Sequence, residues 1–282
     1  MVLLADLSIF ELAFSNSRCQ QNRTINQILF NNDVQICLNE NIINEFEKIL
    51  EETEYFQGFI KELYDNDRIV IEKSNPSLSI KEQFKDIALN SKISFLIPIC
   101  LNRVEEYIQE IENIVVIAES EKINKNWIAI ELLTNSLCNV SYNDFKDDYE
   151  IKLFFDNLFK VPKFIKQIKI FNRDQQINYL DSIKGHDIEF YTKMNGNRMN
   201  LHFRNETKRE MQKVLGRKLK LLFTSNSRII HERKIIFDNL IVTLDNALEN
   251  ITVEEPTWEI YINYDKQKAN TWLDKCGAFY PV

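Results

Sequence analysis

The chain has 282 residues, of which 44% are hydrophobic, and it contains only 5 glycines and 5 prolines. This length and composition are typical of a globular protein with one large or two ordinary domains, and they exclude fibrous and disordered proteins. No apolar run approaches the roughly 18–20 residues that a membrane span needs. The first residues also lack the basic segment and the cleavage site of a signal peptide. We therefore predict a cytoplasmic protein.

Cysteine spacing agrees with this prediction. The five cysteines lie far apart, at positions 19, 37, 100, 138 and 276, and no two of them form a C-x-x-C pair. Neither a zinc site nor a disulfide framework is therefore indicated, and we expect reduced thiols.

Charge divides the chain into two parts. Before residue 141 there are 12 Lys and Arg against 22 Asp and Glu, a net charge of −10. The remaining residues contain 23 Lys and Arg and 20 Asp and Glu, a net charge of +3, and they include all three histidines. This asymmetry indicates two domains with different partners, of which the second tolerates phosphate better.

Residues 1–118 alternate apolar, strand-like runs with helix-like segments. The expected strands are Val2–Leu4, Val34–Leu38, Ile69–Ile71, Phe95–Ile99 and Asn113–Ala118. Asn39 is placed to cap one helix, and a second helix is expected over Phe84–Leu89. Strands that alternate with helices predict a parallel sheet covered on both faces. Asp6 follows the first strand, at the edge where such sheets bind ligands.

This part of the chain resembles PIN nuclease domains. The opening strand, acid and helix of that family are similar to "LLADLSIFELAF", residues 3–14, and its second segment is similar to "CLNENIINEFEKIL", residues 37–50. Its third helix and strand resemble "FKDIALNSKISFLI", residues 84–97, and its last strand resembles "ENIVVIA", residues 112–118. The resemblance covers about 118 residues.

The PIN resemblance implies a site in which several carboxylates hold Mg²⁺ or Mn²⁺ ions that activate water and neutralise phosphate. Asp6 and Glu45 match the first two acids. The third acid should lie near Lys81, and the fourth position falls on residues 98–100, which contain no acid. Because this chain supplies two carboxylates where the family has three or four, a bound divalent ion loses much of its charge compensation, and we expect an inherited fold with an inactive site. Alternatively, Asp6 caps the following helix and Glu45 is one solvated acid of a helix surface.

Residues 119–139 join the two parts. The segment contains neither Pro nor Gly, and its apolar residues around Trp127 fit a packed helix better than a flexible spacer. We predict a connecting helix here, between a first domain at 1–118 and a second domain at 140–282.

The second domain also mixes helices and strands. Helices are expected at Tyr149–Phe159, around Gln175–Ile183, and from Asn205 to Gly216, where Asn and Gly are favoured at the two ends. The expected strands are residues 168–171, 187–194, 218–224, 228–238, 240–245 and 258–265. The chain is thus predicted to be α/β in both domains, with consecutive strands toward its end.

One expected strand contains His231, Arg233 and Asp238 in the pattern H-x-R-x4-D. Residues two apart in a strand point to the same face, so His231 and Arg233 should project together. An imidazole can attack phosphorus or move a proton, and a guanidinium can hold phosphate oxygens through two hydrogen bonds. The pattern therefore predicts a phosphate-handling site, and a packed structural histidine is the alternative.

The same pattern resembles the H-x-K-x4-D signature of the phospholipase-D superfamily, with Arg233 in place of the lysine. More closely, "IHERKIIFDN" followed by "LDNALENI", residues 230–251 with a strand between them, is similar to the carboxy-terminal domain of microtubule-interacting-and-trafficking proteins and its prokaryotic relatives. The resemblance covers about 140 residues. It implies a phospholipase-D-like domain in which His231, Arg233 and Asp238 are the catalytic residues and no cofactor is needed.

Active phospholipase-D enzymes bring paired motifs together, whereas this chain has one good copy. The second H-x-R, at His202-Phe203-Arg204, is followed by Arg209 where an acid is required, so we assign it no role. Cleavage would then need a homodimer. The eukaryotic relatives are non-catalytic and bind membranes, which keeps a binding role open.

Basic residues precede the motif, and we predict that they bind nucleic acid. They are Lys208, Arg209, Lys213 and Arg217. On one helix, 209, 213 and 217 would share a face. Such a stripe fits the phosphate backbone of RNA or DNA, or an anionic lipid surface. Since no aromatic residue is interleaved in it, the expected binding is directed at the backbone.

Both resemblances lead to proteins that act on phosphodiesters. We therefore expect a nucleic-acid-directed component of a prokaryotic antiviral defence or toxin system, with RNA or DNA and a further protein of a multi-component system as partners. This expectation rests on fold association, which does not by itself give function. The alternative is a non-catalytic scaffold or adaptor whose second domain docks a partner protein or an anionic membrane.

Overall fold

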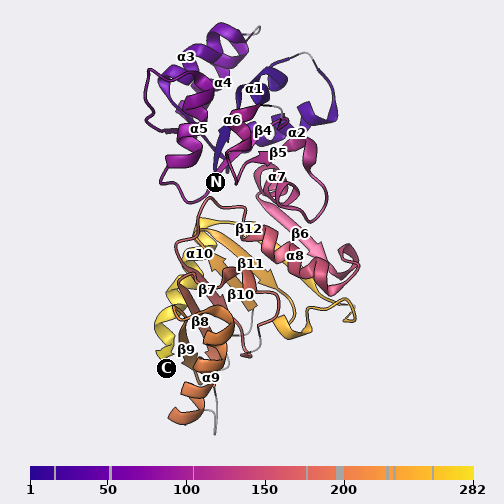
Figure 1. Cartoon of the computed structure of the whole chain (residues 1–282), viewed down its shortest axis with the longest axis vertical. Coiled ribbons are helices and arrows are strands. Elements are labelled where there is room, and N and C mark those ends of the chain that lie inside the picture. Colours follow the sequence, from indigo (N-terminus) through magenta and orange to yellow (C-terminus); the bar gives the residue numbers. More distant parts are fainter. Residues whose placement is uncertain are drawn as a thin grey trace. The chain divides into compact units, whose positions relative to one another are not determined.

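The computed structural model of the chain describes residues 1–15, 17–50, 53–103, 105–175, 177–194, 200–226, 229–230, 233–255 and 257–282. The chain folds into two compact units. Unit 1 comprises Met1–Asn135 and Lys160–Phe164, and unit 2 comprises Ser136–Phe159 and Ile165–Val282. Each unit combines helices with its own sheet (Figure 1), which confirms the predicted α/β class with two domains.

Unit 1 is built on a parallel sheet, here called sheet A. Its strands pair in the order β3-β2-β1-β4-β5. They are β1 (Val2–Ala5), β2 (Gln35–Leu38), β3 (Ile69–Ile71), β4 (Leu96–Cys100) and β5 (Val115–Val116). The central strands β1 and β4 are buried along their whole length, which is why the sequence shows them as continuous apolar runs.

Helices connect the strands of sheet A, and the last helix of the unit follows its final strand. They are α1 (Leu7–Ala13), α2 (Gln20–Leu29), α3 (Glu40–Ile49), α4 (Thr53–Asp65), α5 (Ile80–Asn90), α6 (Glu106–Gln109) and α7 (Lys125–Asn135), with the 3₁₀ turn η1 (Ile117–Glu119). As predicted, Asn39 caps α3, because its side chain accepts a hydrogen bond from the amide of Ile42 at 2.8 Å. Ile42, Ile43 and Phe46 form the buried side of that helix.

The predicted connecting segment 119–139 contains α7 and the first residues of a strand of unit 2. The helix belongs to unit 1, where Ile128, Leu132 and Leu133 are fully buried. The change of unit falls between residues 135 and 136.

Unit 2 is built on a mixed sheet, here called sheet B. Its strands pair in the order β13-β9-β8-β7-β10-β11-β12-β6. They are β6 (Leu137–Ser141), β7 (Ile168–Phe171), β8 (Ile188–Lys193), β9 (Lys220–Thr224), β10 (Arg233–Phe237), β11 (Leu240–Leu244), β12 (Glu259–Tyr264) and β13 (Tyr280–Pro281). β7, β8 and β9 run parallel, and β10 runs antiparallel to β7. The start of β10 therefore lies at the carboxyl edge of the parallel strands.

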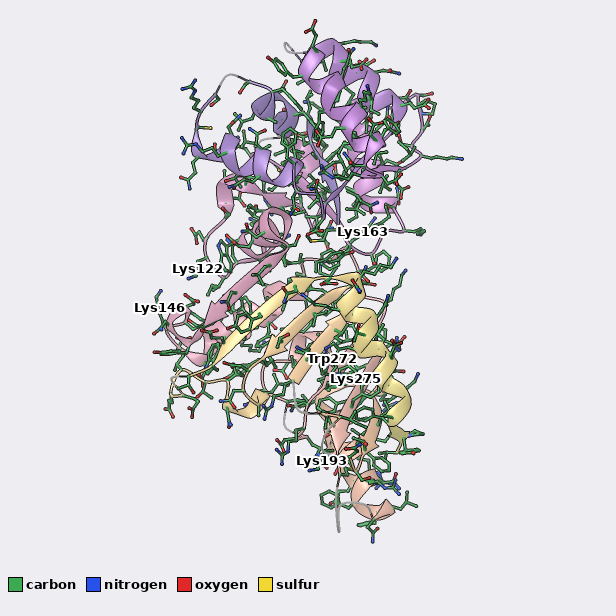
Figure 2. The ribbon with its side chains drawn as sticks, turned by 180° about the vertical axis from the view of Figure 1, so that it is seen from behind. Lys122, Lys146, Lys163, Lys193, Trp272 and Lys275 are labelled. Carbon is green, nitrogen blue, oxygen red and sulfur yellow. The ribbon has the colours of Figure 1, made fainter. Side chains whose placement is uncertain are left out.

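Helices and turns cover the two faces of sheet B. They are α8 (Asp148–Leu158), α9 (Leu201–Leu215), α10 (Lys266–Leu273) and the 3₁₀ turns η2 (Tyr142–Asp144), η3 (Asp181–Ile183), η5 (Leu248–Asn250) and η6 (Asp274–Ala278). Trp272 of α10 packs with Phe171 and Tyr191 on one face, and Lys275 of η6 lies over its ring at 3.5 Å (Figure 2). This face is called the α10 face below.

Two of the predicted helices of unit 2 differ from the structure. In place of the helix predicted around Gln175–Ile183, the described residues 177–183 form an irregular segment that ends in η3, because Tyr179 has a positive φ of 64° that no α-helix accommodates. The second helix, α9, begins at Leu201 instead of Asn205, since the side chain of Asn200 accepts a hydrogen bond from the amide of His202. Its predicted end at Gly216 is confirmed, with φ of 95°.

In the part of the chain that the structure covers, no helix has both the length and the apolarity of a membrane span.

The cysteines are free, and their surroundings predict very different reactivities. Cys19 is exposed at the start of α2, where hydrogen bonds from Ser17 and the amide of Asn22 lower the pKa of its thiol. Burial raises the pKa of Cys37 and of Cys100 to about 12.

Cys19 is therefore expected to react with iodoacetamide at pH 7.5 more than tenfold faster than Cys37 or Cys100, because the thiolate is the reacting species. Peptide mass spectrometry over a time course measures this, with urea-unfolded protein as the control in which the difference disappears. Equal labelling in the folded state would contradict the buried positions of Cys37 and Cys100.

Candidate functional site

Unit 1 contains a cleft of about 1020 Å³ at the carboxyl edge of sheet A. The sheet extends in opposite directions from β1 and β4, so the cleft lies at the switch point where open α/β sheets bind ligands. The amide of Asp6 donates to the carbonyl of Ile99 at 3.0 Å, which holds Asp6 beside the end of β4. The charged and hydroxyl side chains that line the cleft include Asp6, Ser8, Glu11, Glu45, Lys48, Lys81, Glu105 and Tyr107.

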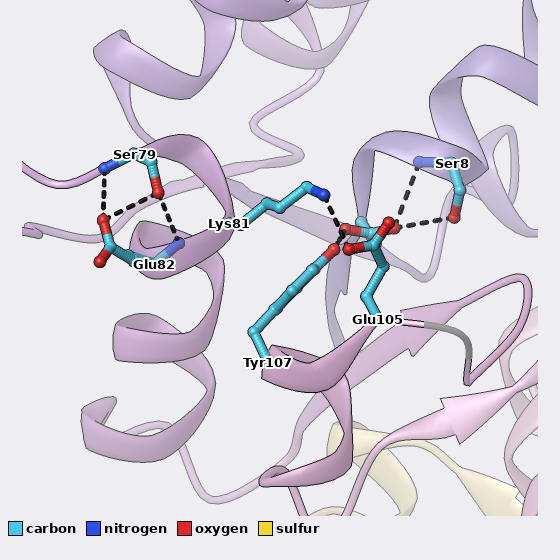
Figure 3. Close-up of polar contacts among 7 residues, drawn as sticks. Ser8, Ser79, Lys81, Glu82, Glu105 and Tyr107 are labelled. Atoms are coloured by element: carbon cyan, nitrogen blue, oxygen red, sulfur yellow. Dashed lines mark hydrogen bonds and ion pairs between the residues drawn. The ribbon is translucent and has the colours of Figure 1, made fainter.

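Asp6 is buried, and both of its carboxylate oxygens accept hydrogen bonds from the protein. The donors, Ser8 and Tyr107, are labelled in Figure 3. Oδ2 accepts from the hydroxyl of Ser8 at 2.8 Å and from its amide at 3.3 Å, so Asp6 caps α1. Oδ1 accepts from the hydroxyl of Tyr107 at 2.5 Å. Burial, and then this hydrogen bond, raise the pKa of Tyr107 well above its usual range. The phenol is therefore a neutral donor to Asp6.

Lysines pair with two further acids of the cleft. The ammonium of Lys81 lies 2.8 Å from Glu105 and 5.6 Å from the centre of the Tyr107 ring (Figure 3). Lys48 lies 2.5 Å from Glu45, one turn away on α3. Both pairs are partly exposed to solvent. Lys81, near which the sequence predicts the third acid, thus contributes a cation to the cleft.

The two predicted metal ligands, Asp6 and Glu45, do line the same cleft. In the arrangement described, each oxygen of Asp6 accepts a hydrogen bond from a hydroxyl group, and the Lys48 and Lys81 ammoniums pair with Glu45 and Glu105. Among the described residues no group of three or more His, Cys, Asp and Glu side chains could hold a metal ion. These residues do not fit Mg²⁺ or Mn²⁺, which need several free oxygen ligands.

Sequence reasoning did not identify Glu105 or Tyr107. The fourth acid is expected at residues 98–100, but these are the last residues of β4 and are buried. Glu105 and Tyr107 follow in the next loop and in α6. Their only sequence signal is that they come soon after the carboxyl end of a central strand.

The structure separates two residues of the predicted catalytic set in unit 2. Arg233 is the first residue of β10, and Asp238 comes directly after its last. Five steps along a strand span roughly 16 Å, so Arg233 and Asp238 lie at opposite ends of β10. Asp238 begins the turn to β11, with a positive φ of 50°. His231 lies outside the described residues.

Arg233 lies at the carboxyl edge of the parallel strands. Lys234 pairs with Phe171 of β7, so Arg233 is beside Asn172, the residue that follows β7. The Lys234 ammonium is 5.2 Å from the Trp272 ring centre, which places Lys234 on the α10 face. Because side chains alternate along a strand, Arg233 projects from the opposite face.

Arg204 lies on this opposite face as well. It is in the first turn of α9, and its guanidinium carbon is 4.6 Å from the centre of the Phe223 ring. Phe223 is in register with Thr192 of β8, and the hydroxyl of Thr192 donates to the carbonyl of Arg173, next to Asn172. Phe223 and Arg233 are therefore three strand spacings apart, about 14 Å.

Several polar groups at this edge are buried. Asn172 and Thr192 are fully buried. The Nε atoms of Arg204 and Arg233 are also buried, and neither has a hydrogen-bond partner. Arg173 follows β7 and Lys193 ends β8 (Figure 2), and they add two cations at the same edge. We call Arg204, Arg233, Asn172 and Thr192 the edge site.

The predicted basic stripe is only partly present. Arg209 and Lys213 are exposed one turn apart on α9, and Lys213 pairs with Glu210 at 2.6 Å. Lys208 instead donates to the carbonyl of Val282 at 2.9 Å. Arg217 comes after the end of α9 at Leu215, so it does not continue the helical face of 209 and 213, contrary to the prediction.

Comparison with known proteins gives only distant likenesses. No protein-family model and no curated protein matches the chain. Among solved structures it is similar to the archaeal chromatin protein TrmBL2, described as showing a novel mode of DNA binding, with 10% identity, a TM-score of 0.31 and coverage of 52% of this chain and 54% of that one. It is also similar to polyphosphate kinase from Porphyromonas gingivalis, with 8% identity, a TM-score of 0.31 and coverage of 47% and 24%.

The chain thus spans about half the length of the first of these structures and about a quarter of the second. Likenesses of this degree establish neither a family nor a function.

Proposed function

We propose that the chain is a nucleic-acid-directed protein of a prokaryotic antiviral defence or toxin system, and that unit 2 binds phosphodiester groups at the edge site. The observation that supports this proposal best is the pair of buried, unpartnered Nε atoms of Arg204 and Arg233 at one edge of sheet B. In this proposal unit 2 is phospholipase-D-like, and unit 1 keeps a PIN-like fold whose cleft is not a metal nuclease site.

The chemistry of the two arginines suits phosphate. A buried donor without an acceptor costs about 1–3 kcal/mol, and more when it is charged. A phosphate offers several acceptor oxygens in a geometry that matches the planar guanidinium fork. Binding of a phosphodiester would therefore satisfy the donors that the fold leaves unpaired. Arg173 and Lys193 would add long-range attraction.

Recognition is favoured over cleavage for two reasons. Arg233 and Asp238 lie at opposite ends of β10 and cannot act on the same phosphorus atom. In addition, one motif per chain supplies one histidine, so turnover through His231 would require a second copy of the chain. Binding through Arg204 and Arg233 requires neither.

The test is fluorescence anisotropy with labelled single- and double-stranded RNA and DNA, in EDTA and over a range of salt concentrations. Arg204→Met and Arg233→Met are each expected to weaken binding about tenfold or more, because a hydrogen bond to a charged group contributes roughly 1.5–3 kcal/mol. Each should also reduce the salt dependence, since one fewer phosphate contact is made. The matched control is Lys268→Met, an exposed cation on α10.

The outcomes separate the possible roles. Unchanged affinity in both arginine variants would refute the edge site. A charge reversal of Arg209 and Lys213 that weakens binding more than Arg233→Met would move the interface to the exposed side of α9. Cleavage in EDTA that is lost in His231→Ala would establish catalysis. Binding to anionic vesicles but not to nucleic acid would support the adaptor alternative.

A further inference from the structure

The aromatic residues next to Arg204 extend from the interior to the surface of unit 2. Phe223 is buried, with the Arg204 guanidinium over its ring at 4.6 Å. Tyr280 of the edge strand β13 is in register with Phe223, and their ring centres are 6.2 Å apart. The Tyr280 side chain is 65% exposed. Residues in register share a face, so Tyr280 lies on the same face as the edge site.

Cations and further apolar groups surround this aromatic pair. Lys208 lies one turn after Arg204 on α9, and its ammonium reaches the carbonyl of Val282, two residues after Tyr280. In the first turn of α9, Leu201 is 62% exposed and Phe203 is 37% exposed. The edge of unit 2 at β9 and β13 therefore combines an exposed ring with two basic side chains.

One exposed aromatic residue is ordinary on a protein surface. Here, however, the exposed ring continues a contact that already involves an arginine with an unpaired donor. An open aromatic face next to cations is the combination that binds a single nucleic-acid strand, because a base stacks on the ring while the cations hold the phosphates. In a duplex, both faces of each base are covered by neighbouring bases.

We infer that the ligand of the edge site is single-stranded nucleic acid, and that Tyr280 provides the platform on which one base stacks. This inference rests on the proposed function and names its substrate class. Arg204 then has two roles, to hold the Phe223 ring against the sheet and to contact the phosphate next to the stacked base. Tyr280 contributes to affinity for single strands only.

The experiment compares a labelled single strand with the duplex of the same sequence, by anisotropy, for wild type, Tyr280→Ala and Tyr280→Phe. Tyr280→Ala should weaken single-strand binding about tenfold or more and change duplex binding less than twofold. Tyr280→Phe should bind as the wild type does, because it keeps the ring. Tyr149→Ala is the matched control, since Tyr149 is a 69% exposed tyrosine of α8 in the same unit.

A single strand without bases gives an independent measurement. Wild type and Tyr280→Ala should bind it with equal affinity, because there is nothing to stack. Equal weakening of single-strand and duplex binding in Tyr280→Ala would overturn the inference, since the ring would then only support the fold.

The failure of this inference can be told apart from the failure of the proposed function. If Arg204→Met weakens binding and Tyr280→Ala leaves single-strand affinity unchanged, the phosphate site stands and the stacking platform is refuted. If neither variant affects binding, both are refuted.

Discussion

Replacement of Trp258 by alanine is expected to lower the free energy of unfolding of unit 2 by about 4 kcal/mol. Trp258 precedes β12, is fully buried, and is the largest of the fully buried side chains. Its ring centre is 5.6 Å from that of Phe145, which in turn contacts Phe154 of α8. Its indole nitrogen donates to the carbonyl of Thr252 at 2.7 Å. Alanine would leave a cavity, and the carbonyl of Thr252 would lose its hydrogen-bond donor.

Urea denaturation followed by circular dichroism measures this loss. Trp258→Phe is the control and should cost less than Trp258→Ala, because it keeps an aromatic ring against Phe145. It loses the hydrogen bond to Thr252, at a cost of roughly 1–2 kcal/mol, and the part of the indole that a phenyl ring does not fill. A loss below about 1 kcal/mol in Trp258→Ala would show that the site collapses around the smaller residue.

Replacement of Asp6 by alanine is expected to destabilise unit 1 by about 2–3 kcal/mol, with or without Mn²⁺. The change removes the cap of α1, which contributes about 1 kcal/mol. It also removes the acceptor of the Tyr107 hydroxyl, which is half-buried, at a further cost of about 1–2 kcal/mol. Asp6→Asn should cost less, because one acceptor oxygen remains.

The matched control is Glu45→Ala, the other predicted metal ligand of the cleft. Its ion pair with Lys48 is exposed, so its removal should change stability by less than about 0.5 kcal/mol. Thermal unfolding of the three proteins, with EDTA and with Mn²⁺, measures both effects. A large stabilisation of the wild type by Mn²⁺, absent in Asp6→Ala and Glu45→Ala, would show that the cleft rearranges to bind metal.

The strands of sheet A could be predicted because each is a short apolar run. For β1 and β4 this pattern follows from burial on both faces, whereas the outer strand β3 is only partly buried. The cap at Asn39 and the end of α9 at Gly216 were also predicted, because each depends on the conformation of one residue and its near neighbours. By contrast, nothing local distinguishes Asn200 from Asn205 as the cap of α9. With Asn200 as the cap, Arg204 lies in the first turn of α9 and contacts Phe223 of β9.

For the candidate sites too, the sequence predicts residues that stand in a local pattern and misses those that are brought in from distant parts of the chain. Asp6 could be placed at the cleft because it follows a strand, and Glu45 because its segment resembles the second segment of PIN domains. The partner of Asp6, Tyr107, is 101 residues away, and no local pattern connects them. The sequence assigns no role to Arg204, because Arg209 stands where its H-x-R pattern would need an acid. Its place at the edge site depends instead on the register of β8 and β9, which no local pattern shows.

The division of the chain into units has a consequence for its synthesis. Residues Lys160–Phe164 belong to unit 1, where the amide and the ammonium of Lys163 donate to the carbonyls of Ser94 and Ser91 at 2.9 and 2.8 Å. The strand and helix at 136–159, which belong to unit 2, are made before them. On the ribosome, the first unit therefore cannot be completed before the second has begun to emerge, and no single proteolytic cut separates the two intact.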